Sequence, residues 1–172
     1  MAERVSPAEI AALLESAVAA IRAEVSALPK ALSTFHPADG EWSINEIIGH
    51  LIEAERRGFA GRIKVLLASK DPQLEGWDQN EVARGRRDDM KTAAKLVTEL
   101  ERMRADSVTL VRGLKAADLK RGGQHPKVGW LRVEDLLQEW VHHDRNHIKQ
   151  ILGNVQAWAW PHMGNAQKFS GE

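Results

Sequence analysis

Four stretches of the chain repeat apolar residues at alternating spacings of three and four, which is the period of an amphipathic helix. They cover residues 7–28, 44–68, 90–114 and 133–152. Each predicts a helix of roughly 30–38 Å at about 1.5 Å per residue. Helices of similar length favour a bundle in which every helix buries one apolar face. In the first stretch the apolar positions are Ile10, Leu14, Ala17, Ile21, Val25 and Leu28.

Local signals mark several of these helix ends. Ser6 with Glu9, and Ser43 with Glu46, form the S-x-x-E pattern of a capping box, in which each side chain bonds the other residue's backbone N–H. Gly153 follows the fourth periodic stretch, in the position where glycine commonly ends a helix. We therefore expect the fourth helix to end near Leu152.

The remaining segments predict loops. No stretch alternates apolar and polar residues over a useful length, so we expect essentially no strand. Residues 29–42, 70–89 and 115–132 are long connections for a bundle, and some should cover one of its ends. The prediction is an all-α single domain over residues 1–172, a four-helix bundle with long connecting loops. Its core spans about 7–153, and the tail at 154–172 is left unassigned.

Composition narrows the function classes. The 172 residues carry no net charge, so the basic surface of a nucleic-acid binder is absent. No apolar run is long enough to span a membrane, and Glu9 and Glu15 interrupt the place where a signal peptide needs its apolar region. These features favour a cytoplasmic protein. The chain has no cysteine, so thiolate ligands and a cysteine nucleophile are excluded.

The fourth helix carries the most suggestive chemistry. His143 and His147 are four residues apart and lie on its apolar stripe, whereas His142 points about 100° away toward the polar side. Two neutral imidazoles one turn apart make a good chelate for zinc or nickel. Buried histidines that merely complete the core are the alternative interpretation. His50, at the edge of the second helix's apolar face, is the best third ligand, although a boundary histidine is the commoner role for such a position.

Two segments together resemble the DinB superfamily. They are E-W-S-I-N-E-I-I-G-H-L-I-E-A-E, at residues 41–55, and H-H-D-R-N-H-I-K-Q-I, at residues 142–151. This family includes damage-inducible DinB proteins, YfiT-like proteins and thiol S-transferases, and the resemblance extends from about Ile10 to Leu152. It implies an up-down-down-up bundle with one divalent metal ion on His50, His143 and His147, and it leaves His142 out.

A site of this kind needs partners that orient the ligands. Three protein ligands leave open positions for water or substrate, which is typical of a reactive site. Residues near the histidines in sequence are candidates for the hydrogen bonds that fix the imidazoles. These candidates are Glu53, Glu139, Asp144 and Gln150.

Other residues are assigned by their surroundings. Trp77 and Asp78 lie in the loop that the resemblance places at the metal, so they are candidates for the substrate pocket, together with Trp140; a tryptophan that anchors the loop is the alternative for Trp77. The mixed charges at residues 84–89 predict a solvated face. Histidines beside proline in turns are interpreted as structural. These are His36, His125 and His162.

The function predicted first is a metal-dependent enzyme resembling the DinB-like thiol S-transferases, in which the metal activates a low-molecular-weight thiol for attack on a small electrophilic substrate. The first alternative is a metal-dependent hydrolase that uses metal-bound hydroxide, with Glu53, Glu139 or Asp144 as general base. The second is a non-catalytic metal or ligand binder in a stress response. Homodimers are common among proteins of this type, and the sequence leaves the oligomeric state open.

Overall fold

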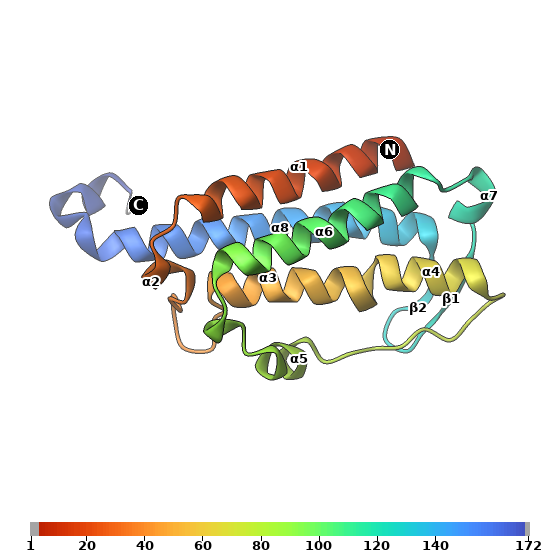
Figure 1. Cartoon of the computed structure of the whole chain (residues 1–172), viewed down its shortest axis with the longest axis horizontal. Helices are drawn as coiled ribbons and strands as arrows, with labels where there is room; N and C mark the ends of the chain where they lie inside the picture. Colours follow the sequence, from red (N-terminus) through yellow and green to blue (C-terminus); the bar gives the residue numbers. More distant parts are fainter. Residues whose placement is uncertain (1–3, 171–172) are drawn as a thin grey trace.

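The computed structural model describes residues 4–170 and contains the four expected long helices. They are α1 (Pro7–Ser26), a broken second helix, α6 (Ala93–Arg112) and α8 (Val133–Ala159). The second consists of α3 (Ile44–Glu53), a π-helical turn (Ala54–Gly58) and α4 (Ala60–Ala68). Figure 1 shows the four packed side by side as a bundle. Along the described residues, none of the helices combines the length and apolar character needed to cross a membrane.

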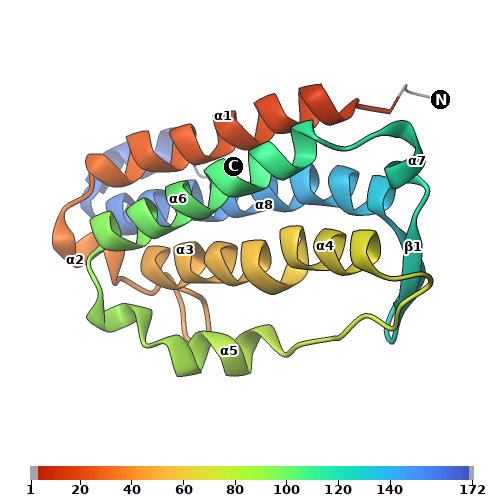
Figure 2. The ribbon, with the colours of Figure 1, turned by 45° about the vertical axis from the view of Figure 1, so that its right-hand side comes forward.

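The helix directions confirm the up-down-down-up order. α1 and α8 run one way along the bundle, and α3–α4 and α6 run the other way (Figure 1). Because α4 ends at the end of the bundle opposite to the start of α6, residues 69–92 must return along its whole length. Figure 2 shows this crossover passing outside α3–α4, with the short helix α5 (Gln79–Arg86) in it. A 3₁₀ turn (Asp88–Met90) then leads into α6.

Both predicted capping boxes and most of the predicted core positions of the first helix are confirmed, whereas the third helix begins at Ala93 rather than near residue 90. The Ser6–Glu9 and Ser43–Glu46 capping boxes both form, at the starts of α1 and α3. Leu28 is only partly buried because α1 ends at Ser26. The other predicted apolar positions of α1 are all buried. They are Ile10, Leu14, Ala17, Ile21 and Val25.

The second helix is not one continuous α-helix as predicted. Its π turn inserts an extra residue at 54–58, and such turns frequently occur at functional sites. Gly61 accommodates it, because a Cβ there would lie 2.1 Å from the carbonyl oxygen of Arg56. The extra residue rotates everything after it by about 100° relative to everything before it. This rotation changes which side chains share a face with His50.

The expectation of no strand is wrong for residues 115–132. After the short helix α7 (Ala116–Leu119), strands β1 (Gly122–His125) and β2 (Gly129–Arg132) form an antiparallel hairpin. Its turn uses Gly129 at φ +79° rather than an Asn-Gly pair, so the usual sequence signal is missing. The crossover pairs with β1, since Leu74 N–H donates to Gln124 O at 2.8 Å. The hairpin and crossover thus support each other.

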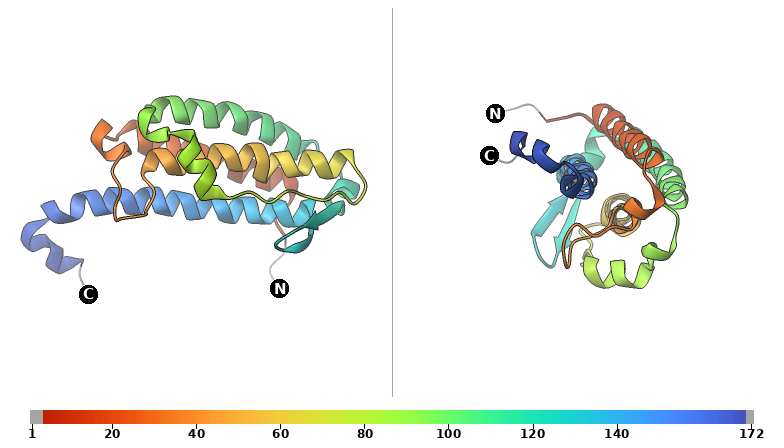
Figure 3. Two further views of the ribbon diagram at one scale, coloured as in Figure 1. Left: turned by 90° about the horizontal axis from the view of Figure 1, so that it is seen from below. Right: turned by 90° about the vertical axis from the view of Figure 1, so that its left-hand side faces the viewer.

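The end predicted for the fourth helix is also wrong, because α8 continues through Gly153 to Ala159. Asn154 is buried and donates to the carbonyl oxygen of Trp42 at 2.9 Å, and Trp158 packs against Phe35. These contacts offset the roughly 1 kcal/mol that glycine costs in a helix. Figure 3 shows the last turns of α8 projecting past the other helices. Two 3₁₀ turns, Trp160–His162 and Gly164–Phe169, complete the described tail.

Gly49 marks the place where the crossover touches α3 most closely. A Cβ there would lie 1.8 Å from Asp88 Oδ2 and 2.9 Å from Arg86 Nε. We expect Gly49→Ala to lower the free energy of unfolding by about 1–3 kcal/mol, because the buried ion pair must move. Gly153→Ala, with nothing within 4 Å of its Cβ, should raise it by about 0.5–1 kcal/mol. Urea unfolding checks both variants, and an equal effect of the two would contradict the close approach at Gly49.

Candidate metal centre

Three histidines from two helices converge. One ligand atom from each of His50, on α3, and His143 and His147, on α8, lies within 4.8 Å of the others. The Nε2 atoms of His50 and His143 are 3.0 Å apart. Nitrogens bound to one ion at about 2.0–2.1 Å are separated by roughly 3.0–3.4 Å, so this spacing fits a shared divalent cation.

The surroundings fix the three rings differently. His147 Nδ1 lies 3.0 Å from Gln150 Oε1, an acceptor, so Nδ1 carries the proton and the Nε2 lone pair is free. His50 is held between two indoles, with ring centroids 4.9 Å from Trp42 and 5.7 Å from Trp77. His143 packs edge-on against Phe59 at 5.0 Å. The Nδ1 atoms of His50 and His143 are buried and lack a hydrogen-bond partner.

Burial keeps the rings of His50 and His147 neutral, as metal ligands must be. Burial, followed by the proximity of His147 and His143, lowers the pKa of His50 to about 3. Burial, followed by the proximity of His143, lowers the pKa of His147 to about 4. The Nε2 lone pair of His147 is free and the Nε2 atoms of His50 and His143 lie 3.0 Å apart, so a cation between the rings would give each ring a partner. The donor set therefore fits a divalent metal ion.

His142 lies outside this cluster. Its side chain is exposed, and its ring contacts Asn146, one turn further along α8, at 3.2 Å. The two adjacent histidines of α8 thus face different surroundings, as the helical period predicted.

A cleft of about 960 Å³ starts at the histidines and runs along the bundle toward the hairpin. His50, Phe59 and Arg62 line it from the broken helix, and Leu136, Glu139 and His143 line it from α8. The crossover closes one side with Trp77 and Asp78, and the hairpin closes the far end. Its residues there are His125, Pro126, Lys127 and Val128. A space of this size accommodates a small organic molecule.

Of the four residues predicted to orient the ligands, only Gln150 makes a hydrogen bond to one. Glu53 is buried but binds Arg56, Arg57 and Arg86, because the crossover brings an arginine to it that sequence spacing could not reveal. Asp144 binds Arg104, and its Oδ1 is 3.9 Å from His143 Nδ1, too far for a hydrogen bond. Glu139 is exposed and lines the cleft, one turn before His143.

Two of the three residues predicted for the substrate pocket line the cleft. Trp77 stacks on His50 and also lies 5.8 Å below the Arg57 guanidinium, so it anchors the crossover as well. Asp78 lines the cleft while capping α5 through the N–H groups of Asn80 and Glu81. The prediction is wrong for Trp140, which does not line the cleft. Its side chain is 1% exposed and stacks on Phe59, which separates it from the cleft.

The charge run at 84–89 is only partly a solvated face. Arg86 bridges Glu53 and the buried Asp88, whereas Arg84 and Arg87 are exposed. His125, interpreted as structural, is in the cleft beside Arg62. Its position beside Pro126 in a predicted loop gave no sign of this placement.

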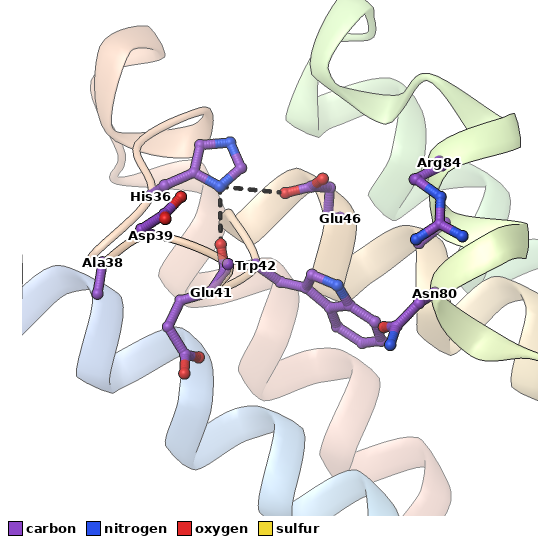
Figure 4. Close-up of a pocket in the computed structure, with 10 residues that line it drawn as sticks. His36, Ala38, Asp39, Glu41, Trp42, Glu46, Asn80 and Arg84 are labelled. Atoms are coloured by element: carbon purple, nitrogen blue, oxygen red, sulfur yellow. Dashed lines mark hydrogen bonds and ion pairs between the residues drawn. The ribbon is translucent and has the colours of Figure 1, made fainter.

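A second hollow, of about 720 Å³, lies on the other side of Trp42 (Figure 4). There His36 Nδ1 donates to the carbonyl oxygen of Glu41 at 2.7 Å and lies 3.5 Å from Glu46, whose carboxylate caps α3. Figure 4 shows the Trp42 indole facing Asn80 and Arg84 across this hollow. His36 is therefore tied to the loop before α3, as predicted.

Comparisons with known proteins agree with the resemblance. The family model of the DinB superfamily matches residues 3–151. A protein of Oceanobacillus iheyensis named "Putative metal-dependent hydrolase" is 21% identical over 121 residues, which are 70% of this chain and 69% of that protein. One of the same name from Bacillus cereus is 22% identical, with the same coverage.

Solved structures share the fold. YfiT from Bacillus subtilis, described as "a probable metal-dependent hydrolase with an unusual four-helix bundle topology", matches with a TM-score of 0.83 at 20% identity, over 93% of both chains. A conserved protein from Enterococcus faecalis matches with a TM-score of 0.65 at 14% identity, over 91% of this chain and 98% of that one.

Proposed function

Because this chain belongs to the DinB superfamily, we propose that it is a metal-dependent hydrolase whose divalent ion is held by His50, His143 and His147. The observation that carries the proposal is the convergence of three imidazoles at one end of a substrate-sized cleft. The names of the Oceanobacillus and Bacillus relatives support the same reaction class. Imidazole ligands suit both zinc and nickel.

When bound, such an ion activates water and polarises the oxygen of a substrate carbonyl or phosphoryl group. The chain's own residues position the substrate. Phe59 and Leu136 offer apolar walls, and Trp77 covers the cleft beside His50. Trp77 and Trp42 enclose the His50 ring, so its orientation is fixed before any ligand enters.

Glu139 is the carboxylate best placed to take a proton from the attacking water. It lies four residues before His143 on α8, so both side chains project on one side of the helix, and both line the cleft. The other cleft carboxylates are occupied, since Asp78 caps α5 and Asp135 binds Arg132. Among the described residues, no cation lies within ion-pair distance of Glu139, which leaves it free to accept a proton.

We expect Glu139→Gln to lower kcat by about 10²–10⁴, the usual contribution of a general base, while the metal content stays unchanged. Steady-state kinetics and metal analysis of the same preparation check both parts. Glu15→Gln is the matched control, since Glu15 is an α1 carboxylate paired with Arg112 and away from the cleft. An unchanged kcat in Glu139→Gln would remove this residue from the mechanism.

The reaction class is tested by stripping the protein with a chelator, reloading it with zinc or nickel, and assaying an activated ester, an activated phosphate and a thiol-reactive electrophile. Each assay is run with and without bacillithiol, mycothiol or glutathione. The proposal expects hydrolysis that follows the metal content and needs no thiol. Absence of hydrolysis in every metal-loaded sample would contradict it.

Thiol transfer is the second candidate, and one observation favours it. Two of the three carboxylates predicted as general base, Glu53 and Asp144, are held by arginines, which leaves only Glu139 for a hydrolase. A metal-bound thiol needs little further base at neutral pH. Turnover of the electrophile only when thiol is present would select this candidate.

A further inference from the structure

Arg62, on α4, is a cation in the cleft without a counter-ion. Its Nη2 atom donates to the carbonyl oxygen of Glu75 at 3.1 Å and lies 3.0 Å from His125 Nε2. Its Nε atom is buried and has no partner. Within residues 4–170, no carboxylate lies within 4.0 Å of this guanidinium, whereas Arg56, Arg57 and Arg86 nearby all bind carboxylates.

In the contact between Arg62 and His125, either tautomer of the histidine leaves two N–H donors facing each other. Burial, followed by the nearby Arg62 and Lys127, lowers the pKa of His125, so the ring is neutral and has one donor and one acceptor. Its Nδ1 accepts the Lys127 backbone N–H at 3.2 Å, which puts the proton on Nε2, opposite an arginine that can only donate. In the other tautomer, Nδ1–H faces the Lys127 N–H instead. An acceptor beside Nε2 and the guanidinium would satisfy both donors.

The π turn places this pair at the far end of the metal cleft. In an unbroken α-helix Arg62 would lie about 120° from His50, but one inserted residue reduces this to about 20°. His50, Phe59 and Arg62 consequently line one cleft. Twelve residues of helix separate His50 from Arg62, or about 18 Å along the axis. The substrate that reaches both is therefore elongated.

Charge is distributed unevenly along this length. Glu139 lies beside the histidines, one turn before His143, whereas Arg62 and Lys127 lie at the hairpin end. Asp135, also at that end, is neutralised by Arg132, with two hydrogen bonds of 3.0 Å. Phe59 and Leu136 provide an apolar middle.

Resting on the proposed function, we propose that Arg62 and His125 form an oxyanion subsite that binds a carboxylate or phosphate at one end of an elongated substrate whose reacting bond lies at the histidine end. The guanidinium Nε–H and Nη–H groups and His125 Nε2–H donate to its oxygens. Arg62 thereby selects anionic substrates.

Calorimetric titration of the metal-loaded protein tests the subsite without requiring turnover. The probes are octanoate, octyl phosphate and octanamide, which share an apolar chain and differ in the charge of the head. We expect octanoate or octyl phosphate to bind at least about tenfold more tightly than octanamide, as a charge-assisted hydrogen bond implies. Whichever of octanoate and octyl phosphate binds more tightly identifies the anionic group that the subsite prefers. Equal binding of all three probes would overturn the proposal, whatever any variant does.

Arg62→Gln locates the binding. It should weaken the anionic probe at least about tenfold and leave octanamide within about twofold, whereas Arg62→Lys, which keeps the charge, should fall between. Arg112→Gln is the matched control, because it removes an exposed α6 arginine outside the cleft. Anion affinity unchanged in Arg62→Gln would assign the probe to the metal and refute the subsite. Anion selectivity that depends on Arg62 in a protein without hydrolytic turnover would reject only the proposed hydrolase.

Discussion

Replacing His143 with alanine is expected to reduce the metal content of the purified protein from about one equivalent per chain to near zero. Two imidazoles from different helices, His50 and His147, would remain, and two ligands hold a divalent ion far more weakly than three. His50→Ala and His147→Ala should have the same effect. All hydrolytic turnover should disappear together with the metal.

His142→Ala is the matched control, because it removes a neighbouring imidazole that is exposed and contacts only the polar side of α8. Gln150→Ala should give an intermediate result, a loss of about 10–100-fold in metal affinity, because Gln150 fixes the proton on His147 Nδ1. Elemental analysis and competition with a chromogenic chelator measure both quantities. Full metal content in His143→Ala, or its loss in His142→Ala, would show that the ligand set is wrong.

The sequence predicts those features of the fold and site that depend on local spacing. The capping boxes at Ser6 and Ser43 need only four consecutive residues each, and both form. The i, i+4 spacing places His143 and His147 on the same face of α8. His50 needed the family resemblance as well, since its helical position alone puts it at the edge of the apolar face.

Other features depend on contacts that sequence spacing does not encode. The π turn at 54–58 rotates Arg62 by about 100° into the cleft, and no composition signal predicts this turn. Glu53 does not orient a ligand histidine as predicted, because it binds Arg86 of the crossover, 33 residues later in the sequence. α8 continues beyond Gly153 because Asn154 and Trp158 contact residues in the segment before α3.

The largest of these long-range features is a buried ion network beneath the metal site. Arg104, on α6, binds Glu55 of the π turn at 2.6 Å and Asp144 of α8 at 2.5 Å, and it donates to the carbonyl oxygen of Leu14 at 3.0 Å. Ser107 also donates to Glu55. All three ionisable side chains are at most 2% exposed. The network therefore joins all four long helices next to His143.

Burial opposes ionisation of both carboxyl groups in this network. For Glu55 burial dominates and the pKa is raised. For Asp144 burial is again the largest single effect, but the attraction and hydrogen bonding of Arg104, together with the neighbouring His143, lower the pKa. The Arg104 charge is thus the largest of the effects that favour an ionised Asp144 in the core. Without it, the carboxylates lose their partner while remaining enclosed by protein.

We expect Arg104→Ala to lower the free energy of unfolding by about 3–5 kcal/mol, because it strands Asp144 and Glu55 in the core. Arg112→Ala, eight residues later on the same helix, breaks an exposed pair with Glu15 and should cost only about 0–1 kcal/mol. Urea unfolding followed by far-ultraviolet circular dichroism gives both values. Equal losses in the two variants would mean that the network contributes no more than a surface pair.

A third variant distinguishes the loss of the arginine's own interactions from the cost of leaving Glu55 and Asp144 buried without a partner. Replacing all three groups at once, as Arg104→Met, Glu55→Leu and Asp144→Leu, leaves no buried charge in this network, so the stability of this variant should be close to that of the wild type or above it. Its metal affinity should fall if the network also fixes the π turn relative to α8, because His50 and His143 lie on opposite sides of that junction. A triple variant as unstable as Arg104→Ala would instead show that the hydrogen bonds and packing of the arginine, rather than its charge, stabilise the bundle.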